Sequence, residues 1–319
     1  MQIIEFTADS LRFVDDLPAQ LPGDRFVWVY LDRDELDTQL PSLQELAQRL
    51  GGSTVLDLHG LDLGSPNHPS HYDYTSVYDL VIFRRLATQT ETRAEAEHDD
   101  AIAAYHGQGG QARIPARGGL PAFNRISSKA VGFVVFDKLL ISVHPRGCYA
   151  ARSFIDRFLS DAKLSVDAQS SRNRIPVTPA DLVLRMVNTM VDSYLNLRKE
   201  LTTQLEHWQA ELLKPNSRFS NWGALMTARS QLHVLEDLCD EQRDAMQEWL
   251  DSLQEQPLSS FSTNPQLAQI QQDSLVARAR DVIEHIERVV RHVRRLEQSA
   301  ETVVQVYFSA QSNRTNDVM

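Results

Sequence analysis

The sequence predicts an α+β fold, in which an α/β sandwich in the N-terminal half is followed by a helical hairpin and a very long stalk helix. Three observations predict it: β-branched and aromatic runs before residue 150, apolar residues at helical spacing after Pro176, and a final apolar seam that repeats about every 3.5 residues. We therefore expect an α/β domain over residues 1–175 and a helical stalk domain over residues 176–319.

Strands and one helix are expected in the first half. The aromatic and β-branched run FVWVYL, residues 26–31, predicts a buried strand. Residues 40–52 have helical spacing and end at two glycines, which predicts a helix. Residues 76–87 predict a second strand, and residues 132–144 predict a β-hairpin that turns at its Asp-Lys pair.

A long insertion is expected between those strands. Residues 91–129 contain Gly-Gly pairs and charge clusters and have weak periodicity. This composition is typical of a mobile insertion. We favour a surface loop over a catalytic lid.

Helices are expected from Thr178 onward. Thr178 provides an N-cap, Pro179 suits the first turn, and Asp181 lies near the positive end of the helix dipole. The apolar stripe that follows is Leu182, Met186, Met190, Tyr194, Leu197, Leu201, Leu205, Trp208 and Leu212. A break at residues 214–216, a second helix over 221–250 and a loop over 256–265 complete the expected hairpin.

The last helix carries an uninterrupted seam. Its members are Leu275, Ala279, Val282, Ile286, Val289, Val293, Leu296, Ala300, Val303 and Tyr307. Alternating steps of four and three indicate a helix that supercoils against partners. A helix over residues 266–313 would be roughly 70 Å long. It either packs on the two preceding helices, lines a symmetric oligomer, or does both with different faces.

Composition limits the function classes. With 32 Lys+Arg against 43 Asp+Glu the net charge is −11, which disfavours a nucleic-acid partner. Cys148 and Cys239 are far apart, so they suit a reducing compartment and ordinary packing. No stretch reaches the about 20 apolar residues that a membrane span needs. No nucleophile elbow, P-loop, dinucleotide fingerprint or HExxH motif is present, so we expect neither an enzyme nor an organic cofactor.

The stretch YFSAQSNRTNDVM, residues 307–319, resembles the segment that precedes the first membrane helix in the CorA family of divalent-cation transporters. Residues 312–319 fit the family pattern S-N-[KR]-T-N-[DE]-V-M position by position. VDSYLNL at 191–197 is similar to a V-D-x-Y segment of the family, and ARDVIEHIERV at 279–289 is similar to its ion-binding stalk segment.

The resemblance implies a cytoplasmic N-terminal domain, truncated before the first transmembrane helix, on the cytoplasmic side of the inner (plasma) membrane. It implies a homopentamer anchored in the membrane through helices beyond this sequence. It also implies passive flux of Mg²⁺ or Co²⁺, gated by intracellular cation bound at subunit interfaces. Asn316 and Met319 would then lie at the pore mouth, and Asp281 would be the aspartate that binds a regulatory ion.

Asp281 and His285 are spaced i,i+4 and share one helix face, so they are a candidate metal site. The carboxylate suits Mg²⁺, whereas the imidazole favours Zn²⁺ or Co²⁺. The alternative is a solvated Asp–His pair. An acidic face on the second helix, of which Glu236, Asp240 and Asp244 are members, is expected to be solvated, and the arginines at 288–295 are expected to pair with acidic neighbours.

In the family, an acidic pair in the α/β half completes the regulatory site. The matching stretch here places Gly64 and Ser65 at those positions, and Asp62 is close but displaced. Asp62 is therefore a weaker metal-ligand candidate. We interpret residues 57–73, rich in Asp and His, as a turn-rich connection with exposed polar side chains.

Two other hypotheses stay open. One is a domain of a ZntB-like zinc transporter, which shares the architecture and is slightly favoured by the histidines. The other is a soluble coiled-coil scaffold whose last helix binds a partner helix.

Overall fold

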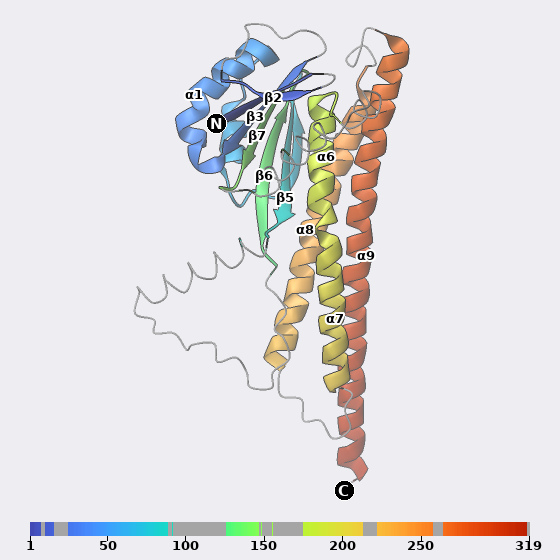
Figure 1. The fold of residues 1–319 in the computed structure, drawn as a ribbon. Helices are drawn as coiled ribbons and strands as arrows, with labels where there is room; N and C mark the ends of the chain where they lie inside the picture. Colours follow the sequence, from blue (N-terminus) through green and yellow to red (C-terminus); the bar gives the residue numbers. More distant parts are fainter. Residues whose placement is uncertain are drawn as a thin grey trace, which may run out of the picture. The chain divides into compact units, whose positions relative to one another are not determined.

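The β-branched and aromatic runs form one mixed sheet in the computed structural model. The structure describes residues 1–7, 10–15, 25–88, 126–146, 175–212, 222–257 and 264–317, with Glu91, Cys148 and Ile155 as single residues. The strands are β1 (Gln2–Phe6), β2 (Leu11–Phe13), β3 (Phe26–Asp32), β4 (His71–Tyr74), β5 (Asp79–Leu86), β6 (Ser128–Val135) and β7 (Leu139–His144). Their order in the sheet is β2-β1-β3-β7-β6-β5-β4 (Figure 1).

At the centre of the sheet, β3 and β7 pair in parallel, and Val29 lies opposite Ile141. The flanking pairs β1–β2, β1–β3, β6–β7 and β4–β5 are antiparallel. Every residue of β7 is buried, as expected for a strand covered on both faces. The predicted hairpin over 132–144 is confirmed, since Val135 pairs with Leu140 across the Asp-Lys turn.

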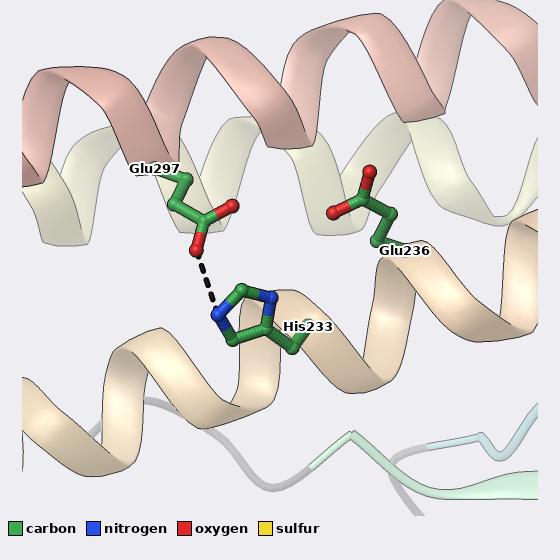
Figure 2. Close-up of side chains that lie close together, drawn as sticks. All are labelled: His233, Glu236 and Glu297. Carbon is green, nitrogen blue, oxygen red and sulfur yellow. Dashed lines mark ion pairs between the residues drawn. The ribbon is translucent and has the colours of Figure 1, made fainter.

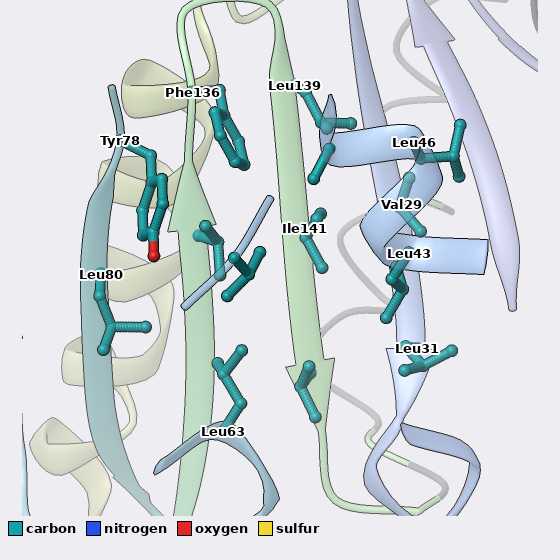
Figure 3. Packing of buried hydrophobic residues seen from close by; sticks show 14 of the residues in the cluster. Val29, Leu31, Leu43, Leu46, Leu63, Tyr78, Leu80, Phe136, Leu139 and Ile141 are labelled. Carbon is teal, nitrogen blue, oxygen red and sulfur yellow. The ribbon is translucent and has the colours of Figure 1, made fainter. Parts of the chain in front are cut away.

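Helices cover one face of the sheet. They are η1 (Arg33–Glu35), α1 (Leu36–Leu46), the π-helical turn η2 (Ala47–Gly51) and α2 (Asp57–Gly64). Leu43 and Leu46 of α1 and Leu63 of α2 belong to the same buried cluster as Val29 and Ile141 (Figure 3). Burial of such side chains contributes about 1.5–3 kcal/mol each, and this core fixes the helices on the sheet.

Gly51 marks a close approach inside this core. A Cβ at this position would stand 2.5 Å from Cδ1 of the Phe136 ring, so only glycine fits. The next residue, Gly52, has a φ of 86° and ends the helical segment in the left-handed conformation. Gly51 therefore allows close packing against Phe136, whereas Gly52 ends the helical segment.

The opposite face of the sheet is also covered. Helix α6 (Pro179–Asp192) contacts β3 and lies on the other side of the sheet from α1 (Figure 1). Trp249 of helix α8 (Trp222–Glu255) is fully buried, and its indole N–H donates to Asp79 at the start of β5. Burial raises the pKa of that Asp79 carboxyl.

The remaining helices are α7 (Tyr194–Leu212) and α9 (Pro265–Asp317). The predicted first helix of the hairpin is divided, because a turn at Ser193 separates α6 from α7. The predicted second and third helices are confirmed as α8 and α9, each a few residues longer than expected. The break at 214–216 lies outside the described residues.

The apolar seam of α9 is buried from Leu275 to Ala300, and Val303 and Tyr307 are half-buried. Its polar neighbours bind the other helices of this chain. Arg278 pairs with Asp181 of α6 at 2.8 Å, and the Gln272 side chain donates to the Leu253 carbonyl of α8 at 3.1 Å. These contacts show the expected intramolecular packing of α9 on the preceding helices of the chain.

The chain divides into two compact units. Unit 1 comprises Met1–Arg85, Lys129–Asp192 and Glu241–Ile286. Unit 2 comprises Leu86–Ser128, Ser193–Asp240 and Glu287–Met319. Helices α8 and α9 contribute residues to both units.

The expectation for residues 57–73 needs correction, and most of the expected insertion at 91–129 lies outside the described residues. Residues 57–73 do not form a turn-rich connection, because α2 and β4 occupy much of this stretch. The α/β half also contains strands β1, β2 and β4, which the sequence analysis did not identify. Most of the expected insertion at 91–129 lies outside the described residues, and its last two residues, Ser128 and Lys129, begin β6.

Candidate metal centres

Asp281 and His285 lie one turn apart on α9, as the spacing predicts. His285 Nε2 is 3.7 Å from Asp281 Oδ1. The Asp281 side chain is 54% exposed and that of His285 is 27% exposed, so a solvated cation can reach both. The pair belongs to unit 1.

The fold adds a third residue to this pair. Asp192, the last residue of α6, places its Oδ1 3.5 Å from His285 Nδ1. The two carboxylates thus flank opposite nitrogens of one imidazole and do not converge on a single point. Asp192 lies in the VDSYLNL segment, far from His285 in the sequence, so no local spacing links the two residues.

Asp62 has a different neighbour. It lies on α2, and its Oδ1 is 3.4 Å from His68 Nε2. The described residues show no ion pair or hydrogen bond between Asp62 and either Asp281 or His285. Asp62 therefore belongs to a separate polar cluster of the α2–β4 region.

His59 in the same region is buried and structural. Its Nε2 is 3.1 Å from Asp73 Oδ2 and its Nδ1 is 2.8 Å from the Tyr78 hydroxyl. Because a carboxylate only accepts, Nε2 carries the proton and Nδ1 accepts from Tyr78 in the neutral ring. Burial alone would raise the pKa of Asp73, but hydrogen bonds from the Tyr74 backbone and from His59 outweigh it and lower that pKa.

Of the two expected pore-mouth residues, only Asn316 lies within α9. Asn316 is in the last turn of the helix, and Met319 lies outside the described residues. Among the helices that the structure describes, none has a stretch long and apolar enough to span a bilayer.

A further cluster of metal-binding side chains lies in unit 2. His233 and Glu236 of α8 and Glu297 of α9 can each offer one ligand atom, and these atoms lie within 4.8 Å of one another (Figure 2). Within the described ranges this is the one group of three or more such residues. The only local signal for this cluster in the sequence is the i,i+3 spacing of His233 and Glu236.

Some arginines of the 288–295 cluster form the expected ion pairs with acidic side chains. Arg294 Nε contacts Glu236 Oε1 at 2.5 Å, and Arg291 contacts Glu287 at 3.1 Å. The acidic face of α8 is otherwise mainly exposed, with Asp240 half-buried. Arg291 and Arg294 of the basic cluster therefore pair with acidic side chains of α8 and α9.

Comparison with known proteins gives a family match. A protein-family model described as "CorA-like Mg2+ transporter protein" matches residues 121–319. Among curated proteins, none matches the sequence significantly.

Solved structures show the same fold at low sequence identity. The soluble domain of CorA from Methanocaldococcus jannaschii is 13% identical, with a TM-score of 0.57 and coverage of 96% of both chains. The complete CorA magnesium transporter from the same organism is 11% identical, with a TM-score of 0.60, covering 100% of this chain and 80% of that one. The ZntB cytoplasmic domain from Vibrio parahaemolyticus RIMD 2210633 is 12% identical, with a TM-score of 0.51, covering 94% and 97%.

Proposed function

Because the chain belongs to the family of CorA-like Mg²⁺ transporter proteins, we propose that it is the cytoplasmic, ion-sensing domain of a divalent-cation transporter. The observation that carries the proposal is the family match over residues 121–319, which includes β6, β7 and all of α6 to α9. The fold supports it, since the soluble domain of an archaeal CorA covers nearly the whole chain. No enzymatic activity is part of this proposal.

In this function the domain sits on the cytoplasmic side of the inner (plasma) membrane and acts within a homopentamer. Residues 1–175 form its α/β domain and residues 176–319 its stalk domain, with Asn316 and Met319 towards the pore mouth. Cations, Mg²⁺ or Co²⁺, flow passively down their electrochemical gradient. Cation bound between subunits holds the pore closed, because a ligand that binds one state better shifts the population towards that state.

Asp281 is the proposed sensor residue, with His285 as its helper. Their partial exposure supports this role, because a ligand from solvent or from a neighbouring subunit can complete the coordination. Asp192 adds a second carboxylate beside the same imidazole. Mg²⁺ keeps several of its waters and is commonly bound through one or two carboxylates, which suits this open arrangement.

A test compares Mg²⁺ binding to the chain by calorimetry with and without the sensor carboxylate. Asp281→Ala should weaken binding by about tenfold, which corresponds to about 1.4 kcal/mol. Asp273→Ala is the matched control, because Asp273 is another exposed aspartate on α9. Equal Mg²⁺ affinity in the wild type and Asp281→Ala would remove Asp281 from the sensor site.

A zinc-transporting function of the ZntB type is the second candidate. The observation that favours it is His285 beside Asp281, since imidazole suits Zn²⁺ better than Mg²⁺. Titration of the same two variants with Zn²⁺ distinguishes the candidates. Preferential loss of Zn²⁺ binding in Asp281→Ala, with Mg²⁺ binding unchanged, would favour the zinc function.

A further inference from the structure

We propose that His233, Glu236 and Glu297 form a binding site for a transition-metal dication of the Zn²⁺ class, which links α8 to α9 within unit 2. The site is separate from the Asp281–His285 pair, which belongs to unit 1. The proposal does not depend on the transport function, because it concerns ion binding by these three side chains alone.

The geometry brings one nitrogen and two oxygen donors together. His233 and Glu236 are spaced i,i+3 on α8 and therefore share a face, and Glu297 reaches them from α9 (Figure 2). His233 Nε2 is already 2.8 Å from Glu297 Oε1. Ligand atoms about 2.1 Å from a tetrahedral Zn²⁺ stand roughly 3.4 Å apart, so side-chain rotations close the remaining distance.

The donor set selects the ion. Zinc accepts imidazole nitrogen and carboxylate oxygen, and a site with three protein ligands leaves a fourth position for water. Mg²⁺ strongly prefers oxygen, so an imidazole ligand disfavours it. His233 is 56% exposed, which gives a hydrated ion a path to the site.

Two arginines bind the same carboxylates when no ion is bound. Arg229 is 3.9 Å from Glu297, and Arg294 contacts both Glu236 and Asp240. The three carboxylates exceed the two guanidinium groups by one negative charge. The Arg294 side chain is 51% exposed and contacts Asp240 as well as Glu236, so it can release Glu236 to a metal ion and retain an acidic partner. The alternative to a metal site is this ion-pair network alone.

The experiment is calorimetric titration of the whole chain with Zn²⁺ at pH 7, together with thermal unfolding with and without Zn²⁺. Loss of an outer-shell partner already costs about 10-fold to 100-fold in metal affinity. Loss of a ligand, in His233→Ala or Glu297→Gln, should therefore weaken Zn²⁺ binding by at least about tenfold. Both variants should also lose the rise in Tm that Zn²⁺ causes in the wild type.

Two controls accompany these variants. His207→Ala removes another exposed histidine, on α7, and should leave Zn²⁺ binding unchanged. Asp281→Ala removes a residue of the separate Asp281–His285 pair, so it should retain Zn²⁺ binding at the His233 site. Wild-type Zn²⁺ affinity in His233→Ala overturns the inference, and so does loss of Zn²⁺ binding in Asp281→Ala alone. Neither of these results contradicts the proposed transport function.

Discussion

Two buried titratable residues of unit 1, Glu5 and His144, have pKa values that their surroundings shift away from the ordinary values. Glu5 is fully buried in β1 and is paired with Arg12 and Arg25. Burial alone would raise the pKa of Glu5, but the hydrogen bonds from the two arginines outweigh it and lower that pKa. Because its pKa is lowered, the Glu5 carboxylate is ionised at neutral pH. Removing either arginine would leave part of a buried charge uncompensated.

His144 at the end of β7 is held in its neutral form, whereas Glu5 is held in its charged form. It is fully buried, its Nε2 lies 2.8 Å from Ser142 Oγ, and its ring stacks on Tyr30. Burial lowers its pKa to about 3, and the positive charges of Arg85 and Arg33 act in the same direction. The ring is therefore neutral in the folded protein over most of the acid range.

The lowered pKa of His144 predicts that the folded protein loses stability as the pH falls. Between pH 6.5 and 3 the unfolded chain binds a proton at His144 that the folded chain does not, so the free energy of unfolding falls as pH decreases. The slope contributed by one such group is up to about 1.4 kcal/mol per pH unit. His144→Phe keeps a ring but cannot titrate, so its stability should fall less between pH 6 and pH 5 than that of the wild type. Urea denaturation at the two pH values measures the difference.

The comparison uses the pH dependence and not the absolute stability, because the variant also loses the contact with Ser142. Glu5 and Asp73 have lowered pKa values and lose their stabilising charge only at lower pH. Identical pH slopes for the wild type and His144→Phe would show that His144 does not carry this acid sensitivity.

At the scale of an element, α9 depends on its seam. Ile286 is 1% exposed within the seam, whereas Ile270, in the second turn of the same helix, is 63% exposed. Removing a buried isoleucine side chain loses its transfer free energy and leaves a cavity. Ile286→Ala should therefore lower the free energy of unfolding by about 2–5 kcal/mol.

Ile270→Ala is the matched control on α9 and should change stability by no more than about 0.5 kcal/mol. Chemical denaturation of both variants, followed by far-ultraviolet circular dichroism, gives the two values. Similar losses in the two variants would contradict the burial pattern that the 3.5-residue repeat predicts.

At the scale of the whole molecule, the net charge opposes self-association. Each chain carries −11 at pH 7, so like-charged protomers repel one another. If divalent cations bind between subunits as proposed, Mg²⁺ should raise the weight-average mass measured by sedimentation velocity at low ionic strength, and a chelator should reverse the effect. Asp281→Asn should respond less than the wild type.

NaCl at matched ionic strength separates site binding from screening, because monovalent salt reduces repulsion between exposed charges without occupying a divalent site. If NaCl raises the mass as much as Mg²⁺ does, association follows from screening alone. The interfacial cation would then have no part in it.

The fold class, the seam of α9 and the family can all be predicted from the amino-acid sequence alone. Periodicity is a local property, and the seam from Leu275 to Ala300 is buried as its spacing predicts. The resemblance carried by residues 312–319 is confirmed by the family match, which favours a transporter domain over a soluble scaffold. These conclusions need only residues that are close together in the chain.

Contacts between residues far apart in the chain, in contrast, become visible only in the folded protein. The α2 segment contains Gly60 and Gly64, which are poor helix formers, so its helix depends on burial of His59 and Leu63. Asp192 reaches His285, and Glu297 reaches His233, across different helices. Such contacts depend on the path of the chain between the partners, and no local pattern encodes that path. The packing of the helices therefore adds Asp192 and Glu297 to the candidate ligands that local spacing indicates.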